Sequence, residues 1–167
     1  MRQTVLRAAR QADLDLLWAF LAMAAYEPSV AAARSTESVA NHLAGWRRAG
    51  DFGFIAESGG APLGAAWARQ FTPRENPAFY VDGHTPEVTI AVHRRNRGRG
   101  AGAALLGALV QEARRRGVGL CLNVRDTNPA MRLYQRAGFI RAQGSQVRNR
   151  VGGVSIGMAL GAPGPET

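Results

Sequence analysis

The sequence has no lysine and a single cysteine, Cys121, among its 167 residues. One cysteine excludes an internal disulfide and any metal site built on cysteine. Cys121 lies between Leu120 and Leu122, and this apolar run predicts a buried side chain rather than a nucleophile. His42 and His84 lack companions at metal-ligand spacing, so we expect no bound metal.

The sequence also lacks a long apolar run. No stretch approaches the roughly 20 apolar residues that a membrane-spanning helix needs, and residues 1–7 lack the apolar core of a signal peptide. We therefore expect a cytoplasmic protein with no membrane partner. Hydrophobic residues make up 46% of the chain and charged residues 20%, as in globular proteins. The length predicts one domain over residues 1–160, followed by a flexible C-terminal tail over 161–167.

The charge of the chain is strongly basic. All 21 basic residues are arginine, and the formal net charge is +9. We attribute the preference for arginine first to the coding bias of a GC-rich genome. The charge predicts attraction to a nucleotide-like cofactor or to nucleic acid, although a solvated surface would carry the same charge. Because the arginines are scattered, with no helix-turn-helix or aromatic-basic surface, we do not expect a nucleic-acid partner.

Apolar periodicity and turn residues predict a mixed α/β chain. The expected strands cover residues 4–8, 52–57, 61–71, 88–92 and 120–124, with a closing hairpin of 139–147 and 151–160. The expected helices cover about 12–26, 36–47 and 100–117, with a short fourth helix capped by Asn128. This order predicts a sheet that is antiparallel at first and parallel across residues 88–124.

The centre of the sequence is a glycine-rich turn between a strand and a helix. Arg97-Gly98-Arg99-Gly100-Ala101-Gly102 follows the strand, and its glycines permit positive φ and a close backbone approach to a ligand. The unpaired N–H groups and the dipole of a helix N-terminus favour an anion. The turn therefore predicts a phosphate site.

A dinucleotide is one candidate for that phosphate. The pattern Gly98-x-Gly100-x-x-Ala103 satisfies the relaxed Rossmann fingerprint. That fingerprint normally opens its domain, whereas here it lies past the middle of the chain. The acid nearest the end of the next strand is Asp126, which is further away than the ribose-binding acid should be and adjoins Arg125. The match to a dinucleotide site is weak.

A second pattern accounts for more of the chain. Arg97-x-x-Gly100-x-Gly102 follows a strand, and Asn128-Pro129-Ala130-x-x-Leu133-Tyr134-x-x-x-Gly138-Phe139 lies downstream. Together these motifs closely resemble the GNAT superfamily of acetyl-CoA-dependent N-acetyltransferases, and the resemblance covers nearly the whole chain. It implies an α/β (α+β) GNAT fold, with a mixed central β-sheet of six to seven strands flanked by about four helices.

The resemblance implies which residues hold acetyl-CoA. Backbone groups of Ile90, Ala91 and Val92 would pair with the pantetheine arm like an added strand. Asn128 would face the pantetheine or the reacting thioester. Arg97 and Arg99 would add positive charge to the pyrophosphate site. The pyrophosphate itself would be held by the backbone N–H groups of Gly98, Arg99, Gly100, Ala101, Gly102 and Ala103.

The resemblance also implies catalytic residues. By position in the motif, Tyr134 matches the general acid that the family usually has. The chemistry agrees, because a phenol with a pKa of about 10 is protonated at neutral pH and can supply the departing thiolate with a proton. Glu87 matches a carboxylate that deprotonates the amine through water in several relatives. A solvated strand-end charge explains Glu87 equally well, and His93 or water are alternative bases. The N–H of Val92 is a candidate donor to the developing oxyanion.

We therefore predict an N-acetyltransferase that moves an acetyl group from acetyl-CoA to a primary amine by direct attack in a ternary complex. The alternative is a non-catalytic CoA-binding or nucleic-acid-binding regulatory module on the same fold. The acceptor amine stays open between a small molecule, an antibiotic, an amino acid and a protein N-terminus. Trp67, Arg69 and Phe71 alternate along one strand, and either line an acceptor pocket or belong to a half-buried strand. The resemblance is also compatible with a homodimer formed through the C-terminal strands.

Overall fold

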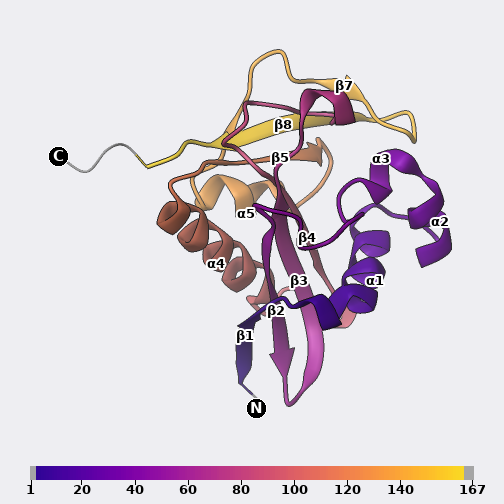
Figure 1. The fold of residues 1–167 in the computed structure, drawn as a ribbon, viewed down its shortest axis with the longest axis vertical. Coiled ribbons are helices and arrows are strands. Elements are labelled where there is room, and N and C mark those ends of the chain that lie inside the picture. The colour runs from indigo at the N-terminus through magenta and orange to yellow at the C-terminus, as the bar shows by residue number, and fades with distance from the viewer. Residues whose placement is uncertain (1–2, 164–167) are drawn as a thin grey trace. The chain divides into compact units, whose positions relative to one another are not determined.

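The computed structural model describes residues 3–163, so most of the expected tail at 161–167 lies outside the described residues. Within 3–163 the chain forms a mixed sheet flanked by helices (Figure 1). The strands are β1 (Thr4–Ala8), β2 (Phe52–Ser58), β3 (Ala61–Arg69), β4 (Glu87–Val92), β5 (Leu120–Arg125), β6 (Ile140–Arg141), β7 (Val147–Arg148) and β8 (Val154–Leu160). The helices are α1 (Leu14–Ala24), α2 (Val30–Ser35), α3 (Glu37–Ala40), α4 (Ala101–Arg116) and α5 (Met131–Arg136).

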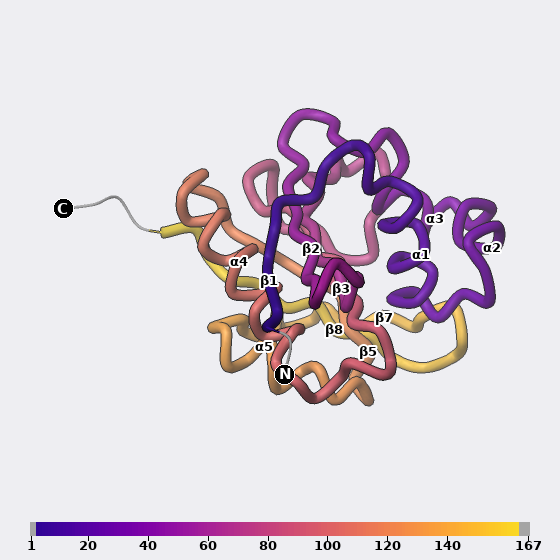
Figure 2. The backbone as a smooth tube through the Cα atoms, turned by 90° about the horizontal axis from the view of Figure 1, so that it is seen from below, coloured from indigo at the N-terminus to yellow at the C-terminus, as the bar shows by residue number. Residues whose placement is uncertain are grey.

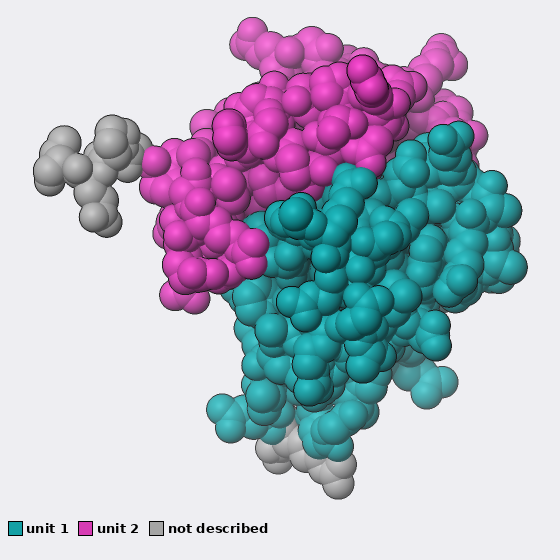
Figure 3. Space-filling model, viewed as in Figure 1, with its two compact units in different colours: residues 1–69, 89–109 teal, residues 70–88, 110–167 magenta. Residues whose placement is uncertain are grey.

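The strand order is β1-β2-β3-β4-β5-β8-β6, and β7 also pairs with β8. The predicted mixed α/β class is confirmed, with eight strands and five helices in the described part of the chain. The chain divides into two compact units (Figure 3). Unit 1 comprises residues 1–69 and 89–109, and unit 2 comprises residues 70–88 and 110–167. Both β4 and α4 therefore contribute residues to each unit.

Unit 1 is built on an antiparallel meander of β1, β2 and β3. β1 pairs with β2 from Thr4↔Ser58 to Ala8↔Phe54, and β2 pairs in turn with β3. The turn between β2 and β3 has positive φ at both Gly59 (57°) and Gly60 (80°). Two such residues are what a two-residue hairpin needs, because their twist matches that of the flanking strands. The predicted hairpin is thus confirmed, with β3 ending at Arg69 rather than at residue 71.

The helical segment of unit 1 differs from the sequence prediction. The expected helix over 36–47 is only the short α3, while α2 begins earlier, where Ser29 Oγ accepts a hydrogen bond from the Ala32 N–H at 3.0 Å. Thr36 has extended backbone angles and separates α2 from α3. The three helices follow one another as a compact group of turns (Figure 2). Ser29 is therefore the residue at which this helical segment begins, seven residues before the expected start.

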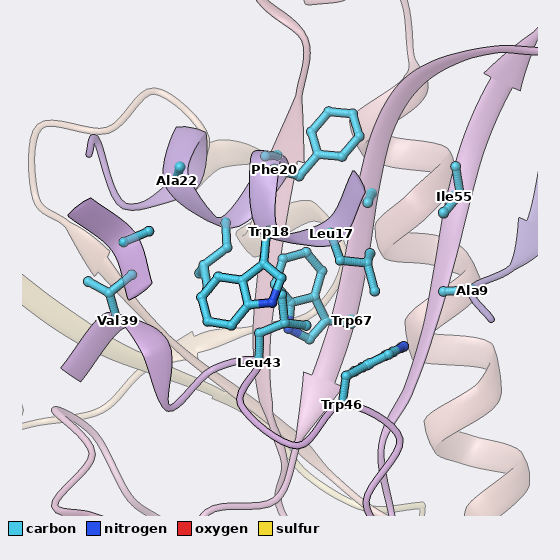
Figure 4. Close-up of a cluster of buried hydrophobic side chains, with 14 residues drawn as sticks. Ala9, Leu17, Trp18, Phe20, Ala22, Val39, Leu43, Trp46, Ile55 and Trp67 are labelled. Carbon is cyan, nitrogen blue, oxygen red and sulfur yellow. The ribbon is translucent and has the colours of Figure 1, made fainter. Parts of the chain in front are cut away.

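The core of unit 1 lies between this helical group and the sheet (Figure 4). Leu17, Leu43 and Trp67 are fully buried in it. The Trp67 ring meets the Trp46 ring edge to face, with 6.5 Å between centroids, and Trp67 Nε1–H donates to the His42 carbonyl at 2.9 Å. Burying such large rings contributes much of the stability of a small core. These contacts fix the segment after α3 against β3.

Unit 2 is built on the pairing of β5 with β8. The two strands run antiparallel from Leu120↔Leu160 to Arg125↔Ser155. The first arm of the predicted closing hairpin is broken into β6 and β7, each of two residues and each paired with β8. Between them, Ser145 Oγ accepts from the Gly157 N–H at 3.0 Å, so a side chain replaces part of the ladder. This break raises the strand count above the expected six to seven.

Candidate functional site

The glycine turn lies in unit 1 and forms an open cradle in front of α4. Gly98 and Gly100 have φ of +74° and +87°, and an added Cβ at either position would meet no atom within 4 Å. The first α4 hydrogen bond in this region runs from the Ala104 N–H to the Gly100 carbonyl at 3.0 Å. The N–H groups of the preceding residues 101–103 therefore come before the helical ladder and are available to an anion.

Several arginines precede the cradle in the sequence or form part of it. Arg97 Nε–H donates to the Val92 carbonyl at 3.2 Å, which ties the turn back to the end of β4. Arg94, Arg95, Arg97 and Arg99 are all exposed. The sequence prediction of a basic glycine turn leading into a helix N-terminus is thus realised in the backbone, with α4 starting at Ala101 rather than at residue 100.

The end of β4 approaches β3 closely in unit 1. A Cβ added at Gly64 would lie 2.6 Å from the Ala91 carbonyl oxygen and 3.1 Å from the Val92 Cα. The His93 N–H donates to the Leu63 carbonyl at 2.7 Å. Gly64 is needed here because any side chain would push the two backbones apart. The β3 side of this strand end is therefore occupied by protein backbone.

Glu87 opens β4 in unit 2 and is buried, with 6% of its surface exposed. Its Oε2 atom has no hydrogen-bond partner among residues 3–163. Burial disfavours the charged carboxylate and raises the pKa of Glu87 to about 8. The alternative of a solvated strand-end charge is therefore wrong for this residue. An ionisable group held near neutrality inside a protein is a candidate acid or base.

Two histidines differ sharply in their surroundings. His93, the alternative base, is exposed at the end of β4. His42 is buried in unit 1, with Nδ1 3.4 Å from Thr89 Oγ1, and burial followed by the charge of Arg69 lowers the pKa of its imidazole to about 4. No local pattern in the sequence indicates this pair, because the contact joins residues 47 positions apart. His42 is a neutral imidazole across the physiological range.

The remaining predicted residues lie in unit 2. Tyr134 is 7% exposed on α5 and packs edge to face against Phe139, with 6.1 Å between ring centroids. Asn128 was expected to cap α5, but the helix starts at Met131 with Ala130 in the cap position. Asn128 Oδ1 instead accepts from the Ala130 N–H at 2.9 Å, so only its Nδ2 group remains to donate to a ligand.

The units thus divide the predicted site residues. Unit 1 contains the backbone of Ile90 to Ala103, and unit 2 contains Glu87, Asn128 and Tyr134. In unit 1, Arg69 is used by the protein itself, because its guanidinium binds Asp51 and the carbonyls of Asn41 and Ala44. It does not line an acceptor pocket.

Residues 3–163 contain no group of three or more His, Cys, Asp or Glu side chains placed to hold a metal ion. None of the helices in that range combines the length and the apolar character needed to cross a membrane.

Solved structures of similar proteins share this fold. A ribosomal-protein-alanine N-acetyltransferase from Brucella melitensis is 27% identical, with a TM-score of 0.70 over 94% of this chain and 99% of that chain. The ribosomal-protein-S18-alanine N-acetyltransferase from Escherichia coli is 23% identical, with a TM-score of 0.70 over 99% of both chains. A protein from Salmonella typhimurium, solved with its cofactor acetyl-CoA, is 22% identical, with a TM-score of 0.73 over 99% of this chain and 97% of that chain.

Among curated proteins, none matches this sequence. The family model for the acetyltransferase (GNAT) family matches residues 5–139, which include β2, β3, the cradle and α5. The motifs that carry the sequence resemblance, from Arg97 to Gly102 and from Asn128 to Phe139, lie inside this range. The chain belongs to the acetyltransferase (GNAT) family.

Proposed function

We propose that this protein is an N-acetyltransferase that moves an acetyl group from acetyl-CoA to a primary amine by direct attack in a ternary complex. The observation that carries the proposal is the cradle in front of α4, where positive φ at Gly98 and Gly100 leaves the backbone open to a ligand. Membership of an acetyltransferase family supports the same conclusion.

The cradle has the chemistry that the phosphates of acetyl-CoA require. N–H groups in the first turn of α4 and the exposed guanidinium of Arg99 both favour an anion. The side chain of Arg97 reaches back to Val92, so it shapes the turn as well as adding charge. Bound acetyl-CoA supplies a thioester, whose carbonyl carbon is open to attack by an uncharged amine.

Glu87 and Tyr134 are the proposed proton-transfer groups. Glu87 would accept a proton from the acceptor amine, and the pKa of about 8 that burial gives it makes it a stronger base than an ordinary carboxylate. Tyr134 would supply the proton to the sulfur leaving group. Its burial and its packing against Phe139 restrict the ring, which supports a positioned donor rather than a mobile one. Asn128 would donate from Nδ2 to the pantetheine or the thioester.

Membership of the family does not identify the amine that accepts the acetyl group. The 27% identity to a ribosomal-protein-alanine N-acetyltransferase makes the α-amino group of a protein N-terminus the first class to test. A screen should therefore include peptides with a free N-terminus, lysine derivatives, free amino acids and aminoglycosides.

Release of free thiol from acetyl-CoA tests the proposal directly. We expect thiol release that depends on an amine from the panel, and a rise in the unfolding temperature with millimolar acetyl-CoA, because a ligand of the native state stabilises it. A rise in that temperature with acetyl-CoA but no turnover would favour the regulatory module. A rise with NAD and none with acetyl-CoA would restore the dinucleotide interpretation.

A further inference from the structure

Unit 2 contains a second buried oxygen without a partner, Asn123 Oδ1 on β5. Like Glu87 Oε2, it has no hydrogen-bond partner among residues 3–163. A buried polar atom left unpaired typically costs about 1–3 kcal/mol, so two of them in one small unit call for an explanation. In the proposed function, neither of these two oxygens binds acetyl-CoA.

The two oxygens lie on one face of the sheet. Glu87 is paired in register with Cys121 on the parallel strand β5, so these two side chains share a face. Asn123 lies two residues beyond Cys121 and returns to that face, because side chains alternate along a strand. Strand spacing and rise put such diagonal neighbours ~8 Å apart at the backbone. Two side chains of this length can therefore reach one small group between them.

An aromatic ring borders the same face. Asn123 is opposite Gly157 on the antiparallel strand β8, and directly opposed residues project to the same side. The Phe79 ring covers Gly157 so closely that an added Cβ would overlap the ring atoms. Phe79 as a whole residue is partly buried. The face thus combines two oxygen acceptors with an aromatic wall.

This combination fits a nitrogen that carries several hydrogens. A carboxylate oxygen and an amide oxygen both accept hydrogen bonds, so they suit a donor-only group, and an aromatic ring is attracted to a cationic one. We propose that Asn123 Oδ1 and Glu87 Oε2 together bind the acceptor amine, with the Phe79 ring as a wall of its site. Asn123 is then a positioning and specificity residue that no motif of the sequence indicates. The inference rests on the proposed function, in which an amine is the acceptor.

The test compares two substitutions at Asn123. Asn123→Leu removes the carbonyl and keeps the shape, and Asn123→Asp restores an oxygen acceptor. The measured quantities are the KM for trialanine amide and the Kd for acetyl-CoA. Loss of one hydrogen bond to a charged group should raise the KM for trialanine amide about tenfold or more in Asn123→Leu, with the Kd for acetyl-CoA nearly unchanged. Asn123→Asp should recover most of the loss.

The unfolding temperature distinguishes an amine-binding role of Asn123 from a purely structural role. Since Asn123→Leu removes an unpaired buried oxygen, its unfolding temperature should equal or exceed that of the wild type. A lower unfolding temperature with an unchanged KM would make Asn123 structural and overturn the inference. An equal weakening of acceptor and acetyl-CoA binding would overturn it too, because the residue would then act on the whole unit.

A failure of the proposed function has a different signature. If wild-type protein releases no thiol with any amine, titration calorimetry with trialanine amide still decides the inference. Binding to the wild type that is lost in Asn123→Leu would keep an amine site in a protein that does not transfer acetyl groups. No binding to the wild type, or equal binding to both proteins, would overturn the inference.

Discussion

Two hydrogen bonds, of 3.1 and 2.7 Å, join the Arg69 guanidinium to the Asp51 carboxylate, and both side chains are only 1% exposed. Arg69 also donates to the carbonyls of Asn41 and Ala44, in the turns after α3. One cation at the end of β3 thereby holds the whole segment that follows α3. A buried guanidinium suits this task because its five N–H donors have a fixed planar arrangement.

We expect Asp51→Ala to destabilise the protein by about 3–5 kcal/mol, because it leaves Arg69 as an unpaired buried charge. The free energy of unfolding in urea measures this loss. The double variant Asp51→Leu/Arg69→Met removes both charges and should be less destabilised than Asp51→Ala. A double variant as unstable as Asp51→Ala would mean that packing, not charge pairing, sets the cost.

Glu87 makes stability depend on pH. The folded pKa of about 8 lies above the unfolded value near 4.5, so between these values the unfolded state releases a proton that the folded state keeps. The contribution of Glu87 to stability should therefore fall as pH rises from about 4.5 to 8, by up to about 1.4 kcal/mol per pH unit. Glu87→Gln should abolish this fall in a series of urea titrations. The same slope in Glu87→Gln would assign it to another group.

His42 should act in the opposite direction. Its folded pKa of about 4 lies below the unfolded value of 6.5, so its contribution is complete above pH 6.5 and is lost as pH falls toward 4. From pH 4.5 to 6.5 the effects of His42 and Glu87 should nearly cancel, and stability should be flat. His42→Leu should expose the Glu87 slope across the whole range from pH 4.5 to 8. A flat region that persists in His42→Leu would exclude this compensation.

Gly100→Asp should abolish acetyl-CoA binding while the protein stays folded. The change places a Cβ and a negative charge where backbone must face a pyrophosphate. Gly60→Asp is the matched control, because Gly60 also has positive φ (+80°) and no atom within 4 Å of an added Cβ. Calorimetry should show loss of binding in the first variant only. Equal affinities in both would remove the cradle from the binding site.

Tyr134→Phe should lower turnover by ~100- to 10,000-fold, the usual contribution of general acid catalysis, with little change in acetyl-CoA affinity. The change removes one hydroxyl and leaves the ring packed against Phe139. Tyr80→Phe is the control, because it deletes a hydroxyl from a tyrosine that is 37% exposed. Steady-state rates are compared per folded molecule. A Tyr134→Phe rate above half of the wild-type rate would show that water protonates the leaving group.

Local signals in the sequence were sufficient to predict much of this fold. The hairpin at Gly59 and Gly60, the strand at Glu87–Val92 and the end of α4 at Gly117 (φ +70°) each depend on residues close together in the chain. The break in the first arm of the closing hairpin could not be predicted in this way. It depends on the contact of Ser145 with Gly157, and no local pattern encodes a partner twelve residues away.

The candidate site likewise has features that local sequence predicts and features that depend on distant contacts. Glycine readily adopts positive φ, so Gly98 and Gly100 in the sequence were enough to predict the backbone of the cradle. The protonation of Glu87 and of His42 depends on burial by residues distant in sequence, which only the folded chain supplies. Asn123 was missed for a similar reason, because only the folded chain shows that its side-chain oxygen is buried without a partner.

The single cysteine gives this protein a built-in reporter. Cys121 is 2% exposed, its thiol donates to the Thr85 carbonyl at 3.4 Å, and burial raises its pKa. Since only the thiolate reacts rapidly, the folded protein should add little background when a disulfide reagent counts released CoA. The same reagent, given hours instead of minutes, should label Cys121 only when β5 separates from its neighbours. The labelling rate would then record how often that strand opens under native conditions.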